Sequence, residues 1–279
     1  MKLRCETEPL TSSEFGLRVN GLDLRVADQD DAQALIDLAA THQVLVVSGQ
    51  QLTPQEQIDF CGKAGTIYPH PLKKNTCQWP EMTYVTNVAE NGKARGYPGP
   101  GFHIWHSDMC YESTPPRFTT FYAERVPEEG GDTLFCDTLA AYDGLPAEIK
   151  EALEGKQAVF GFSQKLMERC QARGHMLQID PEDQRPDTLH PVFRPHPPTG
   201  RKAVYANWTH TDAIDGMSQE QSDQYLNTIF AHCEDPAYIY AHSYREGDLV
   251  IWDNRATLHT GDGAVPEGQA RIMRRVVIN

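Results

Sequence analysis

Trp105-His106-Ser107-Asp108 places a histidine and an aspartate two positions apart, and a further histidine, His259, follows near the C-terminus. Residues two apart in a strand point to the same face, so His106 and Asp108 can bind one ion while Ser107 points away. Two imidazoles and one carboxylate suit a ferrous ion that keeps open positions. His259 completes this set only in a fold that returns the chain to the same place.

A histidine and an aspartate at this spacing are weak evidence alone, because about one such triplet is expected by chance at ordinary composition. The chain has a second triplet, His210-Thr211-Asp212, close to Asn207 and Gly216, which is typical of a loop end. The first triplet instead precedes a strand-like run at 118–122. This context favours His106 and Asp108 as the metal-binding pair.

Composition indicates an acidic globular protein. A chain of 279 residues, 39% hydrophobic and 23% charged, can bury a large core within one domain. Its net charge of −14 argues against a nucleic-acid or anionic-membrane partner. The seven cysteines are scattered without a CxxC pair, which favours reduced thiols over a zinc knuckle. The N-terminus lacks a signal-peptide core, and no run reaches the ~18 apolar residues of a membrane span, so we predict a cytoplasmic protein.

Hydrophobic periodicity predicts a mainly β protein with flanking helices. The helices are expected at 28–40, from Thr53 to about Gly65, at 146–153 and at 218–232. Strands are expected at 44–47, 83–86, 118–122, 133–135, 203–205, 248–252 and 273–278. Many short strands with inserted helices favour a β-barrel or sandwich core in a single domain spanning 1–279. The polar segment at about 163–201 is predicted to be an inserted lid over a site.

The C-terminal run Arg271-Ile272-Met273-Arg274-Arg275 carries three arginines in a strand-like context. Strand alternation predicts that Arg271 and Arg275 point into the barrel, where they would be costly unless they met anions. Arg274 should point to the opposite face, toward solvent or a surface ion pair.

With His106, Asp108, His259 and the C-terminal arginines in this order, the chain resembles the TauD/TfdA family of Fe(II)- and 2-oxoglutarate-dependent dioxygenases. The resemblance runs from about Gly21 to the end of the chain. Its blocks keep their order and spacing, and they are 21–24, 44–50, 52–54, 105–108, 115–116, 130–135, 140–142, 190–191, 247–249, 252–255 and His259.

The resemblance implies a double-stranded β-helix (jelly-roll) core in which His106, Asp108 and His259 bind the iron. It implies that Arg271, helped by the hydroxyl of Thr133, binds the distal carboxylate of 2-oxoglutarate; guanidinium and carboxylate form bidentate pairs. The implied reaction uses O2, releases succinate and CO2, and most often hydroxylates an aliphatic C–H bond.

The implied partner is a small anionic organic substrate such as a carboxylate or sulfonate. Arg275 matches the family position that binds the anionic head group, and the other candidate substrate-binding residues are His70, His210 and Phe102. Assembly into a homo-oligomer stays open.

Two alternatives stay open beside hydroxylation. The same iron core could perform desaturation, C–N cleavage or isonitrile formation in a biosynthetic pathway. A protein of another class, a non-redox cupin-like metal hydrolase or a metabolite-binding protein, would share the metal ligands but would not need Arg271 with Thr133.

Overall fold

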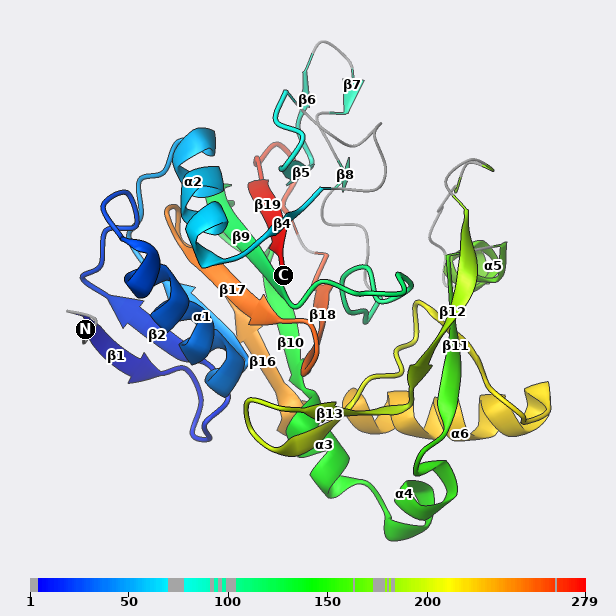
Figure 1. Cartoon of the computed structure of the whole chain (residues 1–279). Helices are drawn as coiled ribbons and strands as arrows, with labels where there is room; N and C mark the ends of the chain where they lie inside the picture. The colour runs from blue at the N-terminus through cyan, green and yellow to red at the C-terminus, as the bar shows by residue number, and fades with distance from the viewer. Residues whose placement is uncertain are drawn as a thin grey trace.

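The centre of the molecule is a pair of β-sheets (Figure 1). The computed structural model describes residues 5–69, 78–90, 93–94, 97–98, 104–162, 164–172, 179, 181, 184–263 and 265–279. The larger sheet has the strand order β1 (Glu6–Pro9), β2 (Leu17–Asn20), β3 (Val44–Val47), β17 (Leu249–Asp253), β9 (Phe118–Arg125), β19 (Ile272–Ile278), β5 (Thr83–Thr86) and β8 (Tyr97–Pro98), with β4 (Ile67–Tyr68) beside β19. The smaller sheet has the order β16 (Ile239–His242), β10 (Thr133–Asp137) and β18 (Thr257–Gly261). The predicted mainly β, jelly-roll class is confirmed.

Alternation along the central strands gives the larger sheet two buried faces. On β9, Phe121 faces an apolar cluster that also contains Phe135 of the smaller sheet, so this cluster fills the space between the sheets. Phe118 and Tyr122 of the same strand join the cluster on the outer face. Helices α1 (Gln29–His42) and α2 (Pro54–Ala64) cover that outer face. Both helices begin at the predicted positions, each with a capping box, and the apolar residues of α1 are buried against the sheet.

A second group of elements packs beside the sheets (Figure 1). It contains the sheet β12 (Arg185–Pro191), β11 (Gln157–Phe162) and β15 (Thr211–Ile214), and the pair β13 (Phe193–His196) and β14 (Arg201–Val204). Its helices are α3 (Thr138–Gly144), α4 (Ala147–Leu153), α5 (Gln164–Ala172) and α6 (Gln219–Cys233). Outside this group, β6 (Ala89–Glu90) and β7 (Lys93–Ala94) form a small sheet of their own. The segment predicted as an insertion thus carries α5, β12 and β13, and β12 pairs with β11 along its length. In the described part of the chain, no helix is long and apolar enough to cross a membrane.

Arg274 is buried, which contradicts the expectation of a solvent-facing side chain. Only 1% of it is exposed, its guanidinium lies 4.2 Å from the ring centre of Tyr122, and its Nε lies 3.3 Å from Glu124. It does point to the outer face, as strand alternation requires. Solvent exposure was wrong because α1 and α2 cover that face, so a side chain pointing away from the barrel meets protein rather than water. The alternative of an ion pair is met by the half-buried Glu124.

Candidate active site

Two chain segments far apart in sequence are joined at His106 and His259. Their backbones form an antiparallel bridge in which each amide donates to the other's carbonyl, at 3.0 and 2.8 Å. The bridge extends the edge of the smaller sheet, where β18 pairs with β10. Because it places both residues at one level, their imidazole rings lie side by side with centroids 4.2 Å apart.

Asp108 completes a cluster that can bind a metal ion. Its two carboxylate oxygens lie 4.0 Å from His106 Nε2 and 3.9 Å from His259 Nε2, and one ligand atom of each residue lies within 4.8 Å of the others. His106 Nδ1 lies 2.9 Å from the carbonyl oxygen of Ile104, which can only accept a hydrogen bond. This contact places the proton on Nδ1 and leaves the lone pair of Nε2 facing the cluster. The donor set therefore fits an ion such as Fe(II).

Electrostatics put the three groups in the protonation states that a metal requires. Burial lowers the pKa of His106, and burial with the neighbouring His106 and Arg275 lowers the pKa of His259 to about 3. Burial alone would raise the pKa of Asp108, but Arg275 and the two histidines hold that pKa well below its ordinary value. Both imidazoles are neutral and the carboxylate is ionised near pH 7, as metal binding needs.

This arrangement predicts that the metal-free protein loses stability in mild acid. The folded state keeps His259 neutral, whereas the unfolded chain takes up a proton below a pKa of about 6.5. The contribution to stability is complete above about pH 6.5 and is lost as the pH falls toward the folded-state value near 3. Lowering the pH from 7 to 5 should therefore cost about 2 kcal/mol of unfolding free energy through this group.

Urea unfolding of chelator-treated wild type and His259→Gln at both pH values checks this prediction. The variant should lose less stability than wild type by about that amount. Equal losses would show that His259 titrates normally in the folded protein.

A buried guanidinium lies on the inner side of the larger sheet, against the apolar cluster between the two sheets. Arg271 is 4% exposed, and its Nε donates to the carbonyl of Gly131 at 2.9 Å. Its guanidinium carbon lies 5.5 Å from the ring centre of Phe121 and 5.6 Å from that of Tyr244. Within the described part of the chain, no carboxylate lies at ion-pair distance from it. A buried cation of this kind is costly unless a ligand anion meets it.

Thr133 lies close to this guanidinium, because Tyr244 contacts both. It is buried, and its hydroxyl accepts a hydrogen bond from Tyr244 at 2.9 Å, which leaves its own proton available to a ligand. Gly131 lies in the left-handed region with φ of 72°, and a Cβ there would lie 2.9 Å from Arg271 Cδ. Glycine is therefore required at this position for two reasons: it adopts this backbone conformation at no steric cost, and it lets the arginine pack this closely.

Comparison with known proteins decides which family has this architecture. The family model described as "Taurine catabolism dioxygenase TauD, TfdA family" matches residues 6–277. The chain belongs to this TauD/TfdA family. An alpha-ketoglutarate-dependent 2,4-dichlorophenoxyacetate dioxygenase of Cupriavidus pinatubonensis is 31% identical over 264 residues, covering 88% of this chain and 88% of that protein. Pentalenolactone F synthase of Streptomyces arenae is 29% identical over 280 residues, covering 96% and 92%.

A solved structure shares the fold over nearly its whole length. The crystal structure of AAD-2 in complex with Mn(II) and N-oxalylglycine has a TM-score of 0.80 and 27% identity, covering 99% of this chain and 97% of that one. This TauD/TfdA protein is therefore a 2-oxoglutarate-dependent non-haem iron dioxygenase that uses Fe(II), 2-oxoglutarate and O2. The alternative of a non-redox hydrolase or metabolite-binding protein is set aside.

Among the residues expected to bind substrate, Arg275 and His210 lie in the described structure, whereas His70 and Phe102 lie outside the described residues. Arg275 Nη1 donates to Asp108 Oδ1 at 2.8 Å, so it reaches the candidate iron ligand itself. His210 is buried, and its ring centroid lies 4.9 Å from that of Tyr111 and 6.1 Å from that of Phe162. In the described residues, its triplet does not form a metal cluster with other histidines or acids.

Tyr244 was not foreseen from the sequence. It lies in the segment after β16, where no motif marks it, and only the folded structure shows that it contacts both Thr133 and Arg271. Burial raises the pKa of Tyr244 well above its ordinary value, so the hydroxyl keeps its proton and acts as a donor.

Replacing Tyr244 with phenylalanine should weaken 2-oxoglutarate binding about 2- to 10-fold, because the Thr133 hydroxyl loses the donor that orients it. The measurement is a 2-oxoglutarate titration of the Mn(II)-loaded protein by calorimetry. Tyr240→Phe is the matched control, since its hydroxyl contacts His242 rather than Thr133. Unchanged affinity in Tyr244→Phe would mean that the hydroxyl does not orient Thr133.

Proposed function

We propose that His106, Asp108 and His259 bind the iron and that Arg271 with Thr133 binds the distal carboxylate of 2-oxoglutarate. The observation that carries this proposal is the buried Arg271 guanidinium on the inner side of the larger sheet, which has no carboxylate at ion-pair distance among the described residues. When bound, iron and 2-oxoglutarate supply oxidising power from O2. The chain's own residues orient the keto-diacid and exclude water.

The substrate that best suits this site is a small organic anion, oxidised at an aliphatic C–H bond and most often hydroxylated. Arg275 supplies a cation next to Asp108, and the rings of Tyr111 and Phe162, stacked with centroids 4.6 Å apart beside His210, are proposed as the apolar side of the substrate site. A relative is named for action on 2,4-dichlorophenoxyacetate, a carboxylate with an aromatic body. Charge at one end and apolar rings at the other would suit an acid of this type.

The second candidate keeps the same iron core but performs another oxidation in a biosynthetic pathway, such as desaturation, C–N cleavage or isonitrile formation. The relative named pentalenolactone F synthase favours a biosynthetic role, because it is similar to this chain over nearly its full length. These outcomes differ in how the substrate is held after C–H cleavage, so product analysis distinguishes them.

The segment 163–201 is proposed to cover the site within a single domain. Leu166 and Cys170 of α5 pack in one cluster with Met109 and Tyr111, which follow Asp108 by one and three positions. Any movement of α5 would therefore change the packing of the residues that follow the metal-binding carboxylate.

A substrate screen tests the proposed function. Carboxylates, sulfonates, sulfates and phosphonates, each with aliphatic or aryloxy bodies, are incubated with Fe(II), 2-oxoglutarate and O2, and succinate is measured with the organic product. At least one class of anion should stimulate succinate formation and yield a product carrying one more oxygen. Stimulation by neutral compounds alone would contradict the anionic substrate class.

Arg275→Ala tests the assignment of the substrate head group. Losing one partner of a buried charge pair typically costs about 2–5 kcal/mol, so the variant should need on the order of 10²-fold more substrate for the same stimulation. Its 2-oxoglutarate affinity should change far less than that of Arg271→Ala. Because Arg275 also contacts Asp108, Mn(II) affinity is measured in parallel. Equal loss of 2-oxoglutarate affinity in the two variants would contradict these roles.

A further inference from the structure

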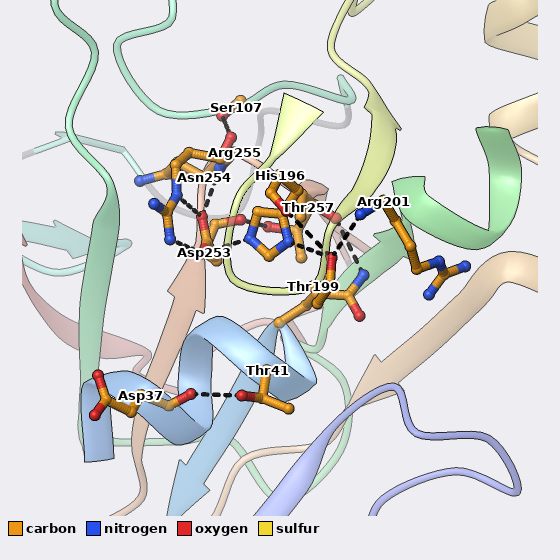
Figure 2. Close-up of polar contacts among 12 residues, drawn as sticks. Asp37, Thr41, Ser107, His196, Thr199, Arg201, Asp253, Asn254, Arg255 and Thr257 are labelled. Carbon is orange, nitrogen blue, oxygen red and sulfur yellow. Dashed lines mark hydrogen bonds and ion pairs between the residues drawn. The ribbon is translucent and has the colours of Figure 1, made fainter. Parts of the chain in front are cut away.

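The Trp252-Asp253-Asn254-Arg255 block lies against the candidate iron ligands without providing one. Figure 2 shows its polar contacts around Asp253, which is fully buried and accepts hydrogen bonds from His196 and Arg255. These contacts hold the turn between β17 and β18, the strand that carries His259. Asn254 has a different set of partners, because it faces the segment that carries Asp108.

The side chain of Asn254 is fixed in one orientation. The indole Nε1 of Trp252, which can only donate, lies 3.0 Å from Asn254 Oδ1. The amide oxygen therefore faces Trp252, and the amide nitrogen, Nδ2, is directed to Thr119 Oγ1 at 3.0 Å. Asn254 is 2% exposed and Thr119 is fully buried, so water does not compete for these contacts.

The hydroxyl of Thr119 is then left with one direction for its proton. Because it accepts from Asn254 Nδ2, it donates to Asp108 Oδ2, which lies 2.7 Å away. The backbone of Asn254 adds a second connection, since its carbonyl accepts from the hydroxyl of Ser107 at 2.7 Å (Figure 2). Side chain and backbone of one residue thus hold both the carboxylate and the chain next to it.

We propose that Asn254 and Thr119 are positioning residues for the metal-binding carboxylate: Asn254 orients the Thr119 hydroxyl, and that hydroxyl holds Asp108 in the rotamer that faces His106 and His259. The inference rests on the proposed iron site. Groups that orient a metal ligand through hydrogen bonds typically contribute about 10- to 100-fold in metal affinity.

The test is calorimetric titration of the metal-free protein with Mn(II). Thr119→Val removes the hydroxyl at nearly constant volume and should weaken Mn(II) binding about 10- to 100-fold. Thr119→Ser keeps the hydroxyl and should recover most of that affinity. Thr120→Val is the matched control, because Thr120 is equally buried on the same strand but donates to the carbonyl of Val276 on the outer face. Its affinity should match wild type.

A double-mutant cycle tests whether Asn254 acts through Thr119. Asn254→Ala should weaken Mn(II) binding much more in the wild-type background than in Thr119→Val, where the only further loss is the hydrogen bond that Asn254 Oδ1 accepts from the amide of Asp108 at 3.4 Å. Thermal unfolding of the metal-free variants accompanies each titration, because a purely structural role would lower the midpoints of Thr119→Val and Thr120→Val without separating their metal affinities.

The outcomes distinguish this inference from the iron site itself. If wild type fails to bind Mn(II), or Asp108→Ala binds as wild type does, the proposed metal site is wrong. If that site behaves as proposed but Thr119→Val keeps wild-type affinity, or Asn254→Ala weakens binding equally in both backgrounds, the positioning role is wrong.

Discussion

Asp108→Ala is expected to lose tight metal binding and, with it, succinate formation. Even a group that only orients a metal ligand contributes about 10- to 100-fold in affinity, so loss of the sole carboxylate of the cluster should exceed 100-fold. The loss should be visible in Mn(II) titration of the chelator-treated protein. Circular dichroism of the same sample shows whether the variant is folded, which matters because Asp108 is buried against Arg275.

The second triplet of the chain supplies a matched control for this change. Asp212 is also a buried aspartate two positions after a histidine, but it lies outside the metal cluster. Asp212→Ala should keep the Mn(II) affinity of wild type. Equal losses of Mn(II) affinity in Asp108→Ala and Asp212→Ala would mean that the metal site was assigned to the wrong triplet.

Arg271→Ala is expected to weaken 2-oxoglutarate binding by about 2–5 kcal/mol, roughly 30- to 4,000-fold, because one partner of a desolvated ion pair is removed. Arg271→Lys should fall between wild type and alanine, since an ammonium lacks the planar fork that binds a carboxylate through two hydrogen bonds. Titration of the Mn(II)-loaded variants with 2-oxoglutarate measures both effects.

Metal affinity is the internal control for the Arg271 variants. Arg271 contacts Gly131 and Asn87 rather than the ligand cluster, so Mn(II) binding should stay close to wild type. A variant whose affinities for Mn(II) and for 2-oxoglutarate fall to the same degree has lost the structure of the whole site rather than one contact. Retention of full 2-oxoglutarate affinity in a folded Arg271→Ala would remove the proposed anchor.

The sequence carried most of the information needed for the candidate site, and the reason is periodicity. Alternation in a strand places His106 and Asp108 on one side, and the resemblance to the TauD/TfdA family indicated where the chain returns at His259. The structure brings these three residues together. Periodicity also predicts that Arg274 and Arg275 point to opposite faces of the larger sheet. It could not reveal that α1 and α2 cover the outer face, where Arg274 lies.

Tertiary contacts account for what the sequence did not reveal. Tyr244 contacts Thr133, 111 positions away, and Thr119 contacts Asn254, 135 positions away. An isolated tyrosine or threonine in a β-rich sequence carries no pattern that would reveal such a contact. The polar composition of 163–201 indicated an insertion, yet pairing with β11 makes part of it a strand. Strand formation there depends on the neighbouring strand more than on local propensity.

A crystal structure of the protein with Mn(II) and N-oxalylglycine, in which an NH replaces one CH2 of 2-oxoglutarate, tests the central claim most directly. We expect one metal ion bound by His106 Nε2, a carboxylate oxygen of Asp108 and His259 Nε2, with the distal carboxylate of the ligand against Arg271 and Thr133. A metal ion bound elsewhere, or a ligand whose distal carboxylate lies away from Arg271, would contradict it.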